Sequence, residues 1–531
     1  MSATALEDSV SEVLTDVRNA ALSRSVTSPV GHQAEAWRRK LGEPMRVAVA
    51  GEIKRGKSTL VNALIGAEGG LTVADAEAEA AMATGQLETT YVLTEIVHGS
   101  RPSLRVLRKD GTAEDVSLTR LREFTARRAD ASLDDVERVV VTLPAPLLSR
   151  FRLIDTPGFN SVYGTDAQNA LSILTGDEVR AADAVVYAIA NEGLSQVSEQ
   201  VARQFSTGGD DSAPLTPMKA IGVVPRANEH WFGLLRDRRR DPTVDTDPFV
   251  LARREIETTM RGPGRGLFHA IVPVNALLGE AAALATDEDF AAIAELTGVE
   301  DDLLLESFAQ MPHQSRAFAA RTDFPLEPDR RQRLITTFSS WGLWRAIVQS
   351  RAKPPIDELR AELDRISGVA ALRDLVHNHF GARAGAIRVS GALAQITAAN
   401  RRIRLHQPPG SQELAVCEDI GRRLEDVMLA HSVLFAQIDV LGKVYQGLVR
   451  FSPAQREDLL RLTGERGMGL PERLGLEPGA SPAELRQAAV TAAARWATAA
   501  ATLTGSARLA ARDLQRSLDT LLAQIDTPER P

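Results

Sequence analysis

Two glycines, a lysine and a serine near the start of the chain have the spacing that chemistry on a phosphate group requires. In GEIKRGKS, Gly51 and Gly56 stand five positions apart, and Lys57 and Ser58 follow directly. Glycines let backbone N–H groups approach phosphate oxygens, which larger side chains would block. The lysine is then expected to reach the terminal phosphates, and the serine hydroxyl to hold Mg²⁺. Thr59 continues the segment, and we include it among the expected nucleotide contacts.

A second short motif, DTPG, lies further along the chain in RLIDTPG. The apolar pair Leu153 and Ile154 predicts a strand that delivers Asp155 at its end. An acidic side chain in that place organises Mg²⁺ through water, and the N–H of Gly158 meets a γ-phosphate. The same residue types also make plain turns. The phosphate-binding loop upstream favours the nucleotide interpretation.

Between these motifs, Thr90 precedes the expected strand YVLTEIVHG. A threonine there supplies a second hydroxyl ligand to Mg²⁺, one that is released when the γ-phosphate leaves. The predicted metal ligands are therefore Ser58, Thr90 and Asp155. Threonine is also a common strand residue, so the sequence leaves the role of Thr90 open. The order of phosphate loop, threonine and DTPG is typical of a GTPase.

The residues that select the base are expected after a later strand, in MKAIGVVPRANEHW. An N/T-K-x-D tetrapeptide reads guanine there, because its aspartate accepts hydrogen bonds from the ring N–H and the amino group. Arg226 can lay its aliphatic stem on the base as a lysine does, but Asn228 lacks the charge of the aspartate. Guanine specificity is therefore left open. A last strand ends at Asn275, where a backbone N–H is expected to meet the guanine oxygen.

Short apolar strands and amphipathic helices must position these residues. RVAVA reads as a strand leading into the glycine loop, and KSTLVNALIG as a helix whose N-terminus adds its dipole to the phosphate site. Strands alternate with helices as far as about residue 380, which predicts a mostly parallel sheet. We divide the chain into N-terminal helices at 1–43, a nucleotide domain at 44–380 with a helical insertion around 280–335, and a helical bundle at 381–531.

The helical part carries its own local signals. Residues 411–451 have the length of one long helix. Ser481 and Glu484 predict an N-cap with a capping box, and Pro482 fits the first helical position. A stripe that begins at Leu509 is expected to face the core of the bundle. The predicted fold class is thus an α/β nucleotide domain with a large α-helical bundle.

Bulk properties exclude several classes of protein. The chain has 531 residues, a net charge of −8 and a single cysteine, so neither a disulfide framework nor nonspecific nucleic-acid binding is expected. The start of the chain lacks a charged segment followed by an apolar core, so no signal peptide is expected. No run of about 20 apolar residues is present. A ribosome-assembly GTPase would carry a basic appendage, which the acidic balance disfavours.

The chain resembles the bacterial dynamin-like GTPases. The resemblance rests on GEIKRGKSTLVNALIG, on DDVERVVVTLPAPLLSRFRLIDTPG, and on tail segments such as LLRLTGERGMGLPERLGL, and it runs over most of the chain. It implies GTP and Mg²⁺ as ligands, slow or assembly-stimulated hydrolysis, and a helical stalk. It also implies a cytoplasmic protein that contacts the inner face of the cell membrane peripherally. On that membrane the protein is expected to associate with itself or with a dynamin-like paralogue. Two turns, LGKVYQGLVRFSPAQ and GERGMGLPERLGL, carry apolar residues for that contact.

The phosphate loop departs from the eukaryotic members of the family. Those proteins place Gln and Ser where this chain has Ile53 and Lys54, and Arg55 follows. Lys54 and Arg55 can stabilise charge that develops during hydrolysis, and the predicted catalytic residues are Lys57, Thr90 and Lys54. Lys54 and Arg55 can equally be solvated loop cations. A catalytically weak scaffold that binds an active paralogue is the alternative function.

Overall fold

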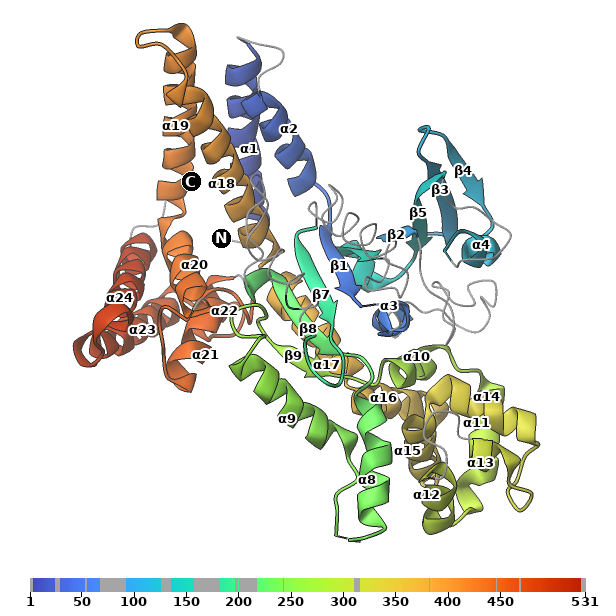
Figure 1. Cartoon of the computed structure of the whole chain (residues 1–531). Coiled ribbons are helices and arrows are strands. Elements are labelled where there is room, and N and C mark those ends of the chain that lie inside the picture. The colour runs from blue at the N-terminus through green and yellow to red at the C-terminus, as the bar shows by residue number, and fades with distance from the viewer. Residues whose placement is uncertain are drawn as a thin grey trace. The chain divides into compact units, whose positions relative to one another are not determined.

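The computed structural model places most of the chain in two compact units (Figure 1). The sheet unit comprises Arg46–Arg203 and Ala220–Asp374, and the helical unit comprises Met1–Met45, Gln204–Lys219 and Leu375–Pro531. The structure describes residues 3–23, 29–52, 55–66, 92–125, 135–156, 182–195, 199, 217–241, 243–309, 316–381, 383–445, 447–467 and 469–526.

One nine-stranded sheet forms the centre of the sheet unit, in the order β4-β3-β5-β2-β6-β1-β7-β8-β9. Strands β1, β7, β8 and β9 run parallel to one another, as do β2 and β5. Strand β6 is antiparallel to β2, and β3 is antiparallel to both β4 and β5. The predicted mostly parallel sheet is confirmed. The strands are β1 Met45–Gly51, β2 Leu93–His98, β3 Ser103–Arg108, β4 Ala113–Val116, β5 Val136–Leu143, β6 Phe151–Asp155, β7 Ala184–Ala188, β8 Ala220–Val224 and β9 Ile271–Pro273.

The parallel strands are apolar because helices and loops cover both of their faces. Strands β7 and β8, with the sequences AVVYA and AIGVV, are buried at every residue. The C-terminal ends of β1, β7, β8 and β9 lie at one edge of the sheet, so the loops that follow them gather there. In parallel sheets this edge is where ligands bind.

Helices of the sheet unit follow the strands and then form a separate apolar cluster. Trp231 and Phe308 are fully buried in that cluster, which also contains Phe318 and Phe338. The helices are α3 Lys57–Gly66, α4 Leu121–Thr125, α8 Trp231–Arg238, α9 Pro248–Arg261, α10 Ala276–Leu284, α11 Asp287–Glu295, α12 Asp301–Ala309, α13 Arg316–Ala320, α14 Pro328–Phe338, α15 Ser340–Ser350, α16 Ile356–Ser367 and α17 Val369–Leu375. A π-helix, Val376–Gly381, follows α17.

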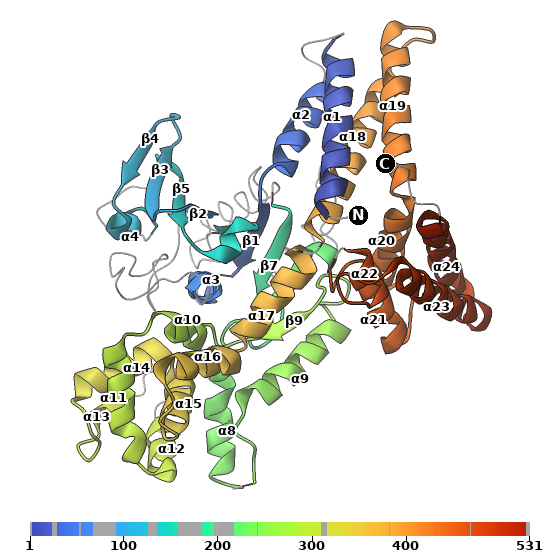
Figure 2. The same cartoon turned by 180° about the vertical axis from the view of Figure 1, so that it is seen from behind.

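The helical unit has one continuous core to which both ends of the chain contribute. Val10, Leu14 and Val17 of α1 are fully buried in it, and α1 packs against both α18 and α19 (Figure 2). The helices are α1 Ala3–Leu22, α2 Pro29–Leu41, α18 Ala384–Leu405, α19 Gln412–Ala430, α20 Ser432–Tyr445, α21 Pro453–Leu462, α22 Leu470–Leu474, α23 Pro482–Thr502 and α24 Gly505–Asp526.

The local predictions for this unit have mixed outcomes. The capping box is confirmed, with Ser481 accepting from the backbone N–H of Glu484 at the start of α23. The single helix over 411–451 is wrong, because the chain breaks at His431 and α19 and α20 meet at 83°. The apolar stripe of α24 is buried at Leu514, Leu518 and Leu521, but Leu509 is 59% exposed.

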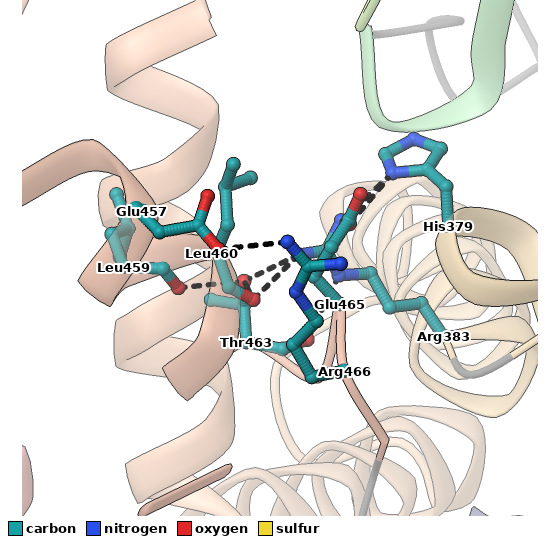
Figure 3. Close-up of polar contacts among 8 residues, drawn as sticks. All are labelled: His379, Arg383, Glu457, Leu459, Leu460, Thr463, Glu465 and Arg466. Atoms are coloured by element: carbon teal, nitrogen blue, oxygen red, sulfur yellow. Dashed lines mark hydrogen bonds and ion pairs between the residues drawn. The ribbon is translucent and has the colours of Figure 1, made fainter. Parts of the chain in front are cut away.

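An arginine on the chain between the π-helix and α18 closes one end of α21 (Figure 3). Arg383 donates to the carbonyl oxygens of Leu460 and Thr463, at 2.8 and 2.9 Å, and pairs with Glu465. The carbonyl groups at a helix end have no partner within the helix itself, and Arg383 supplies donors to two of them here. His379, which is fully buried, contacts the same carboxylate with Nδ1 at 3.0 Å. The pairing lets the core hold charged groups that would be costly alone.

In the turns expected to carry a membrane contact, most of the apolar residues that the structure describes are buried or pack against the core. In the first, Tyr445 and Val449 are buried, whereas Leu448 is 61% exposed. In the second, Leu470 packs against the core of the helical unit, and Met468 lies outside the described residues. Among the described helices, none alone has the length and apolarity to span a bilayer, although the bent pair α19 and α20 passes that test jointly.

Candidate nucleotide-binding site

The glycine loop connects β1 to α3, and its backbone angles favour glycine at positions 51 and 56. Gly51 has a φ of 144°, and a Cβ atom there would lie 2.5 Å from the carbonyl oxygen of Ala188 in β7. Gly56 has a φ of 81°. Both backbones are thus in a conformation that L side chains rarely adopt. The predicted loop is therefore shaped for close approach by a ligand.

Lys57 is the first residue of α3 and is almost completely buried. Its ammonium donates to the carbonyl oxygen of Glu52 at 3.0 Å. Burial lowers the pKa of Lys57 to about 8, against the opposing attraction of the Asp155 and Glu52 carboxylates. A buried cation at a helix N-terminus, where backbone N–H groups also point outward, is an environment that favours an anion. A bound phosphate would restore the ordinary pKa by supplying negative charge.

Ser58 and Asp155 meet although they are far apart in sequence. The Ser58 hydroxyl donates to Oδ2 of Asp155 at 2.7 Å, and Asp155 is fully buried at the end of β6. The following residue, Thr156, anchors this strand end by donating its hydroxyl to the carbonyl oxygen of Val49 in β1 at 2.8 Å. A hydroxyl and a carboxylate oxygen in contact are the kind of ligand pair that Mg²⁺ takes. The donor set therefore fits Mg²⁺.

An acidic residue inside the glycine loop was missed by sequence reasoning. Glu52 is buried and holds the guanidinium of Arg55 through Nη2 at 3.0 Å and Nε at 3.2 Å. Ser195, which follows β7, donates its hydroxyl to the other carboxylate oxygen of Glu52. Arg55 is thus tied back within the loop. A carboxylate among the residues of a phosphate loop was the signal that could have revealed this link.

The predicted base-side residues follow β8 and β9. Arg226 forms an isolated bridge with Asn275, and a Cβ atom at Gly56 would lie 3.9 Å from Nε of Arg226. The arginine therefore lies beside the phosphate loop, where its stem can flank a base. Asn228 is in the short 3-10 helix Ala227–His230.

The side chain and the backbone N–H of Asn275 are both hydrogen-bonded within the protein. It is fully buried, its side chain accepts from the N–H of Leu278, and its amide donates to Ser339 at 3.1 Å. Its backbone N–H donates to Ser367 at 2.7 Å, and that of Ala276 donates to Pro225 at 2.9 Å. The N–H groups that we expected to meet the guanine oxygen are therefore already engaged.

Three predicted residues, Lys54, Thr90 and Gly158, lie outside the described residues. Of the others, the structure brings Gly51, Gly56, Lys57, Ser58 and Asp155 together at the C-terminal ends of β1 and β6. Arg55 and Arg226 lie beside this group, and Thr59 lies half-buried in the first turn of α3.

Known proteins are similar in sequence to this chain. Residues 47–206 match the sequence model of the dynamin family, and isoniazid-induced protein IniC of Mycobacterium tuberculosis is 29% identical over 469 residues, covering 87% of this chain and 86% of that protein. The chain thus carries a dynamin-family domain. Over shorter stretches, this dynamin-like protein is also similar to dynamin-like protein 2 of Campylobacter jejuni, at 24% identity over 147 residues, which is 26% of this chain and 22% of that protein.

Solved structures that align with this dynamin-like protein include one of an oligomerised bacterial dynamin pair described as sensing and tethering membranes. It has 13% identity and a TM-score of 0.28, and the alignment covers 92% of this chain and 91% of that one. A second is the LeoA bacterial dynamin GTPase from ETEC, with 11% identity, a TM-score of 0.26, and coverage of 99% and 88%.

Proposed function

We propose that this dynamin-like protein binds GTP with Mg²⁺ and hydrolyses it. The observation that carries the proposal is the convergence of Lys57 with the Ser58–Asp155 pair, which lie at 2.7 Å, beside a loop built around Gly51 and Gly56. The buried ammonium supplies positive charge for the terminal phosphates. The hydroxyl and carboxylate oxygens suit Mg²⁺, which neutralises the charge of the phosphates during transfer.

Titration calorimetry with GTP and a nonhydrolysable analogue tests the proposal. We expect binding that requires Mg²⁺ and is lost in Lys57→Ala. Lys109→Ala is the matched control, because Lys109 is an exposed lysine of the same unit. Equal affinity of Lys57→Ala and the parent protein would show that the loop does not hold the phosphates.

We further propose that the protein self-associates, alone or with a dynamin-like paralogue, on the cytoplasmic face of the cell membrane and remodels it. Membership of the dynamin-like proteins supports this. So does a groove of about 970 Å³ along α18, whose lining includes Leu393, Leu405, Met428, Phe435 and Arg401. Leu405 and Met428 are 73% and 47% exposed. Apolar surface beside an arginine suits an anionic bilayer surface.

Flotation with anionic liposomes tests this second proposal. We expect the fraction that floats to rise with protein concentration and with a nonhydrolysable GTP analogue, because assembly adds avidity. The double variant Leu405→Asp, Met428→Asp should float less. Leu509→Asp, Val490→Asp is the control, since these residues are also exposed apolar side chains of the helical unit. A parent protein that never floats contradicts the membrane proposal and leaves the nucleotide proposal standing.

A catalytically weak scaffold is the second candidate. The observation that favours it is the engagement of the Asn275 and Ala276 N–H groups within the protein, which weakens the base site. The two candidates differ in turnover: a scaffold binds GTP through Lys57 but releases no phosphate above background, with or without liposomes.

A further inference from the structure

Glu229 directly follows Asn228, which occupies the position where a base-reading aspartate is expected. Glu229 lies in the same 3-10 helix, and its Oε1 is 3.3 Å from Nη1 of Arg226. Asn191, which follows β7, donates its amide both to Oε2 of Glu229 and to the carbonyl oxygen of Arg226, each at 3.0 Å. Two segments at the edge of the sheet, one after β7 and one after β8, thus hold this carboxylate in a defined place.

The place is beside the nucleotide loop. Arg226, the direct partner of Glu229, runs past Gly56 of that loop, 3.9 Å from the position of a Cβ atom there. Glu229 is 48% exposed, so its carboxylate remains accessible to a ligand from solvent. Asn228 makes no side-chain hydrogen bond to the part of the chain that the structure describes. The ordered acceptor in this helix is therefore Glu229.

We propose that Glu229 is the residue that recognises the base, and that it selects guanine. This inference rests on the proposed nucleotide function. A carboxylate accepts hydrogen bonds from the N1–H and the 2-amino group of guanine. Such hydrogen bonds are strong because the acceptor is charged. Adenine has a lone pair at N1 and no 2-amino group, so it offers the carboxylate an acceptor. Xanthine has a carbonyl at C2, which the carboxylate repels.

The opposite edge of the base adds little to this discrimination. The N–H groups of Asn275 and Ala276, which could have met the guanine O6, donate to Ser367 and Pro225 instead. An Asn228-centred site would behave differently from a Glu229-centred one. The amide NH₂ of an asparagine donates to the C2 carbonyl of xanthine, so a site read by Asn228 prefers xanthosine triphosphate over GTP.

Competition against a fluorescent GTP analogue in the presence of Mg²⁺ tests the proposal. The four competing nucleotides are GTP, ATP, xanthosine triphosphate and inosine triphosphate. The base of inosine triphosphate lacks the 2-amino group of guanine. The parent protein should bind GTP most tightly and inosine triphosphate less tightly, with the other two weakest. Glu229→Gln should weaken GTP binding by about tenfold to a hundredfold. Its ATP affinity should stay within about twofold of the parent value, since the phosphate contacts are untouched.

Glu300→Gln, an exposed glutamate of the same unit, should leave all four affinities unchanged. The proposal is overturned if Glu229→Gln binds GTP like the parent protein, or if the parent protein prefers xanthosine triphosphate to GTP. In both cases the proposed nucleotide function stands, provided that Lys57→Ala loses binding. If the parent protein binds none of the four nucleotides, the nucleotide function fails, and this inference fails with it.

Discussion

Replacing Lys57 by methionine should stabilise the nucleotide-free protein. Burial lowers the pKa of Lys57 from 10.5 to about 8, which corresponds to about 3 kcal/mol of unfavourable free energy for the charged form at about 1.36 kcal/mol per pH unit. Methionine removes this cost but also the hydrogen bond from Nζ to Glu52 at 3.0 Å, which is worth about 1 kcal/mol. We therefore expect Lys57→Met to raise the free energy of unfolding by about 2 kcal/mol at neutral pH.

The pH dependence of this gain has a defined sign. Because the folded protein lowers the pKa of Lys57, the unfolded chain binds more protons than the folded one between the folded value of about 8 and the ordinary value of 10.5. The free energy of unfolding of the parent protein therefore rises with pH across this window. Lys57→Met lacks this titration, so its advantage is full below about pH 8 and shrinks towards pH 10.5.

Urea-induced unfolding, followed by circular dichroism from pH 7 to pH 10, measures both effects. Lys109→Met introduces the same change at an exposed lysine of the sheet unit, and it should shift the free energy of unfolding by less than about 0.5 kcal/mol. The reasoning is refuted if Lys57→Met is no more stable than the parent protein at pH 7, or if its advantage is the same at pH 10 as at pH 7.

Three further perturbations probe the site. Ser58→Ala removes the hydroxyl that lies 2.7 Å from Asp155, so GTP affinity measured by calorimetry should become nearly independent of Mg²⁺; a preserved Mg²⁺ effect would place the metal elsewhere. GTP affinity of the parent protein should fall by about tenfold per pH unit above about pH 8, because phosphate binds the charged form of Lys57; a flat profile to pH 10 would contradict this. Glu52→Gln removes a buried carboxylate beside the expected phosphate site and releases Arg55, so it should raise GTP affinity, whereas Arg55→Ala should lower it. A lower GTP affinity of Glu52→Gln and a higher one of Arg55→Ala would show that the Glu52–Arg55 pair instead supports the loop.

The core of the fold was predictable because its signals are local. RVAVA followed by glycines and KST specifies strand, loop and helix within a few residues, and Gly51 and Gly56 have the backbone angles that glycine alone adopts readily. Tertiary packing decides features that have no such signal. The break at His431 between α19 and α20 lies in a sequence of ordinary helix formers, and Leu509 follows the apolar spacing of α24 yet faces solvent.

The candidate site shows the same division. Ser58 and Asp155 were paired from motif spacing, and the structure has them in hydrogen-bond contact. Glu52 and Glu229 were missed because their positions depend on partners that come from other loops, Ser195 for the first and Asn191 for the second. The commitment of Asn275 to Ser339 and Ser367 likewise follows from helices α15 and α16, which the nucleotide motifs do not encode.

Phosphate release from GTP tests the central claim most directly. With the purified protein, Mg²⁺ and excess GTP, with and without anionic liposomes, we expect steady release by the parent protein and by Lys109→Ala. Release by Lys57→Ala should fall to the background rate, because this variant lacks the buried ammonium beside Ser58 and Asp155. Release by Lys57→Ala at the rate of the parent protein, or no release by the parent protein under either condition, would contradict the account.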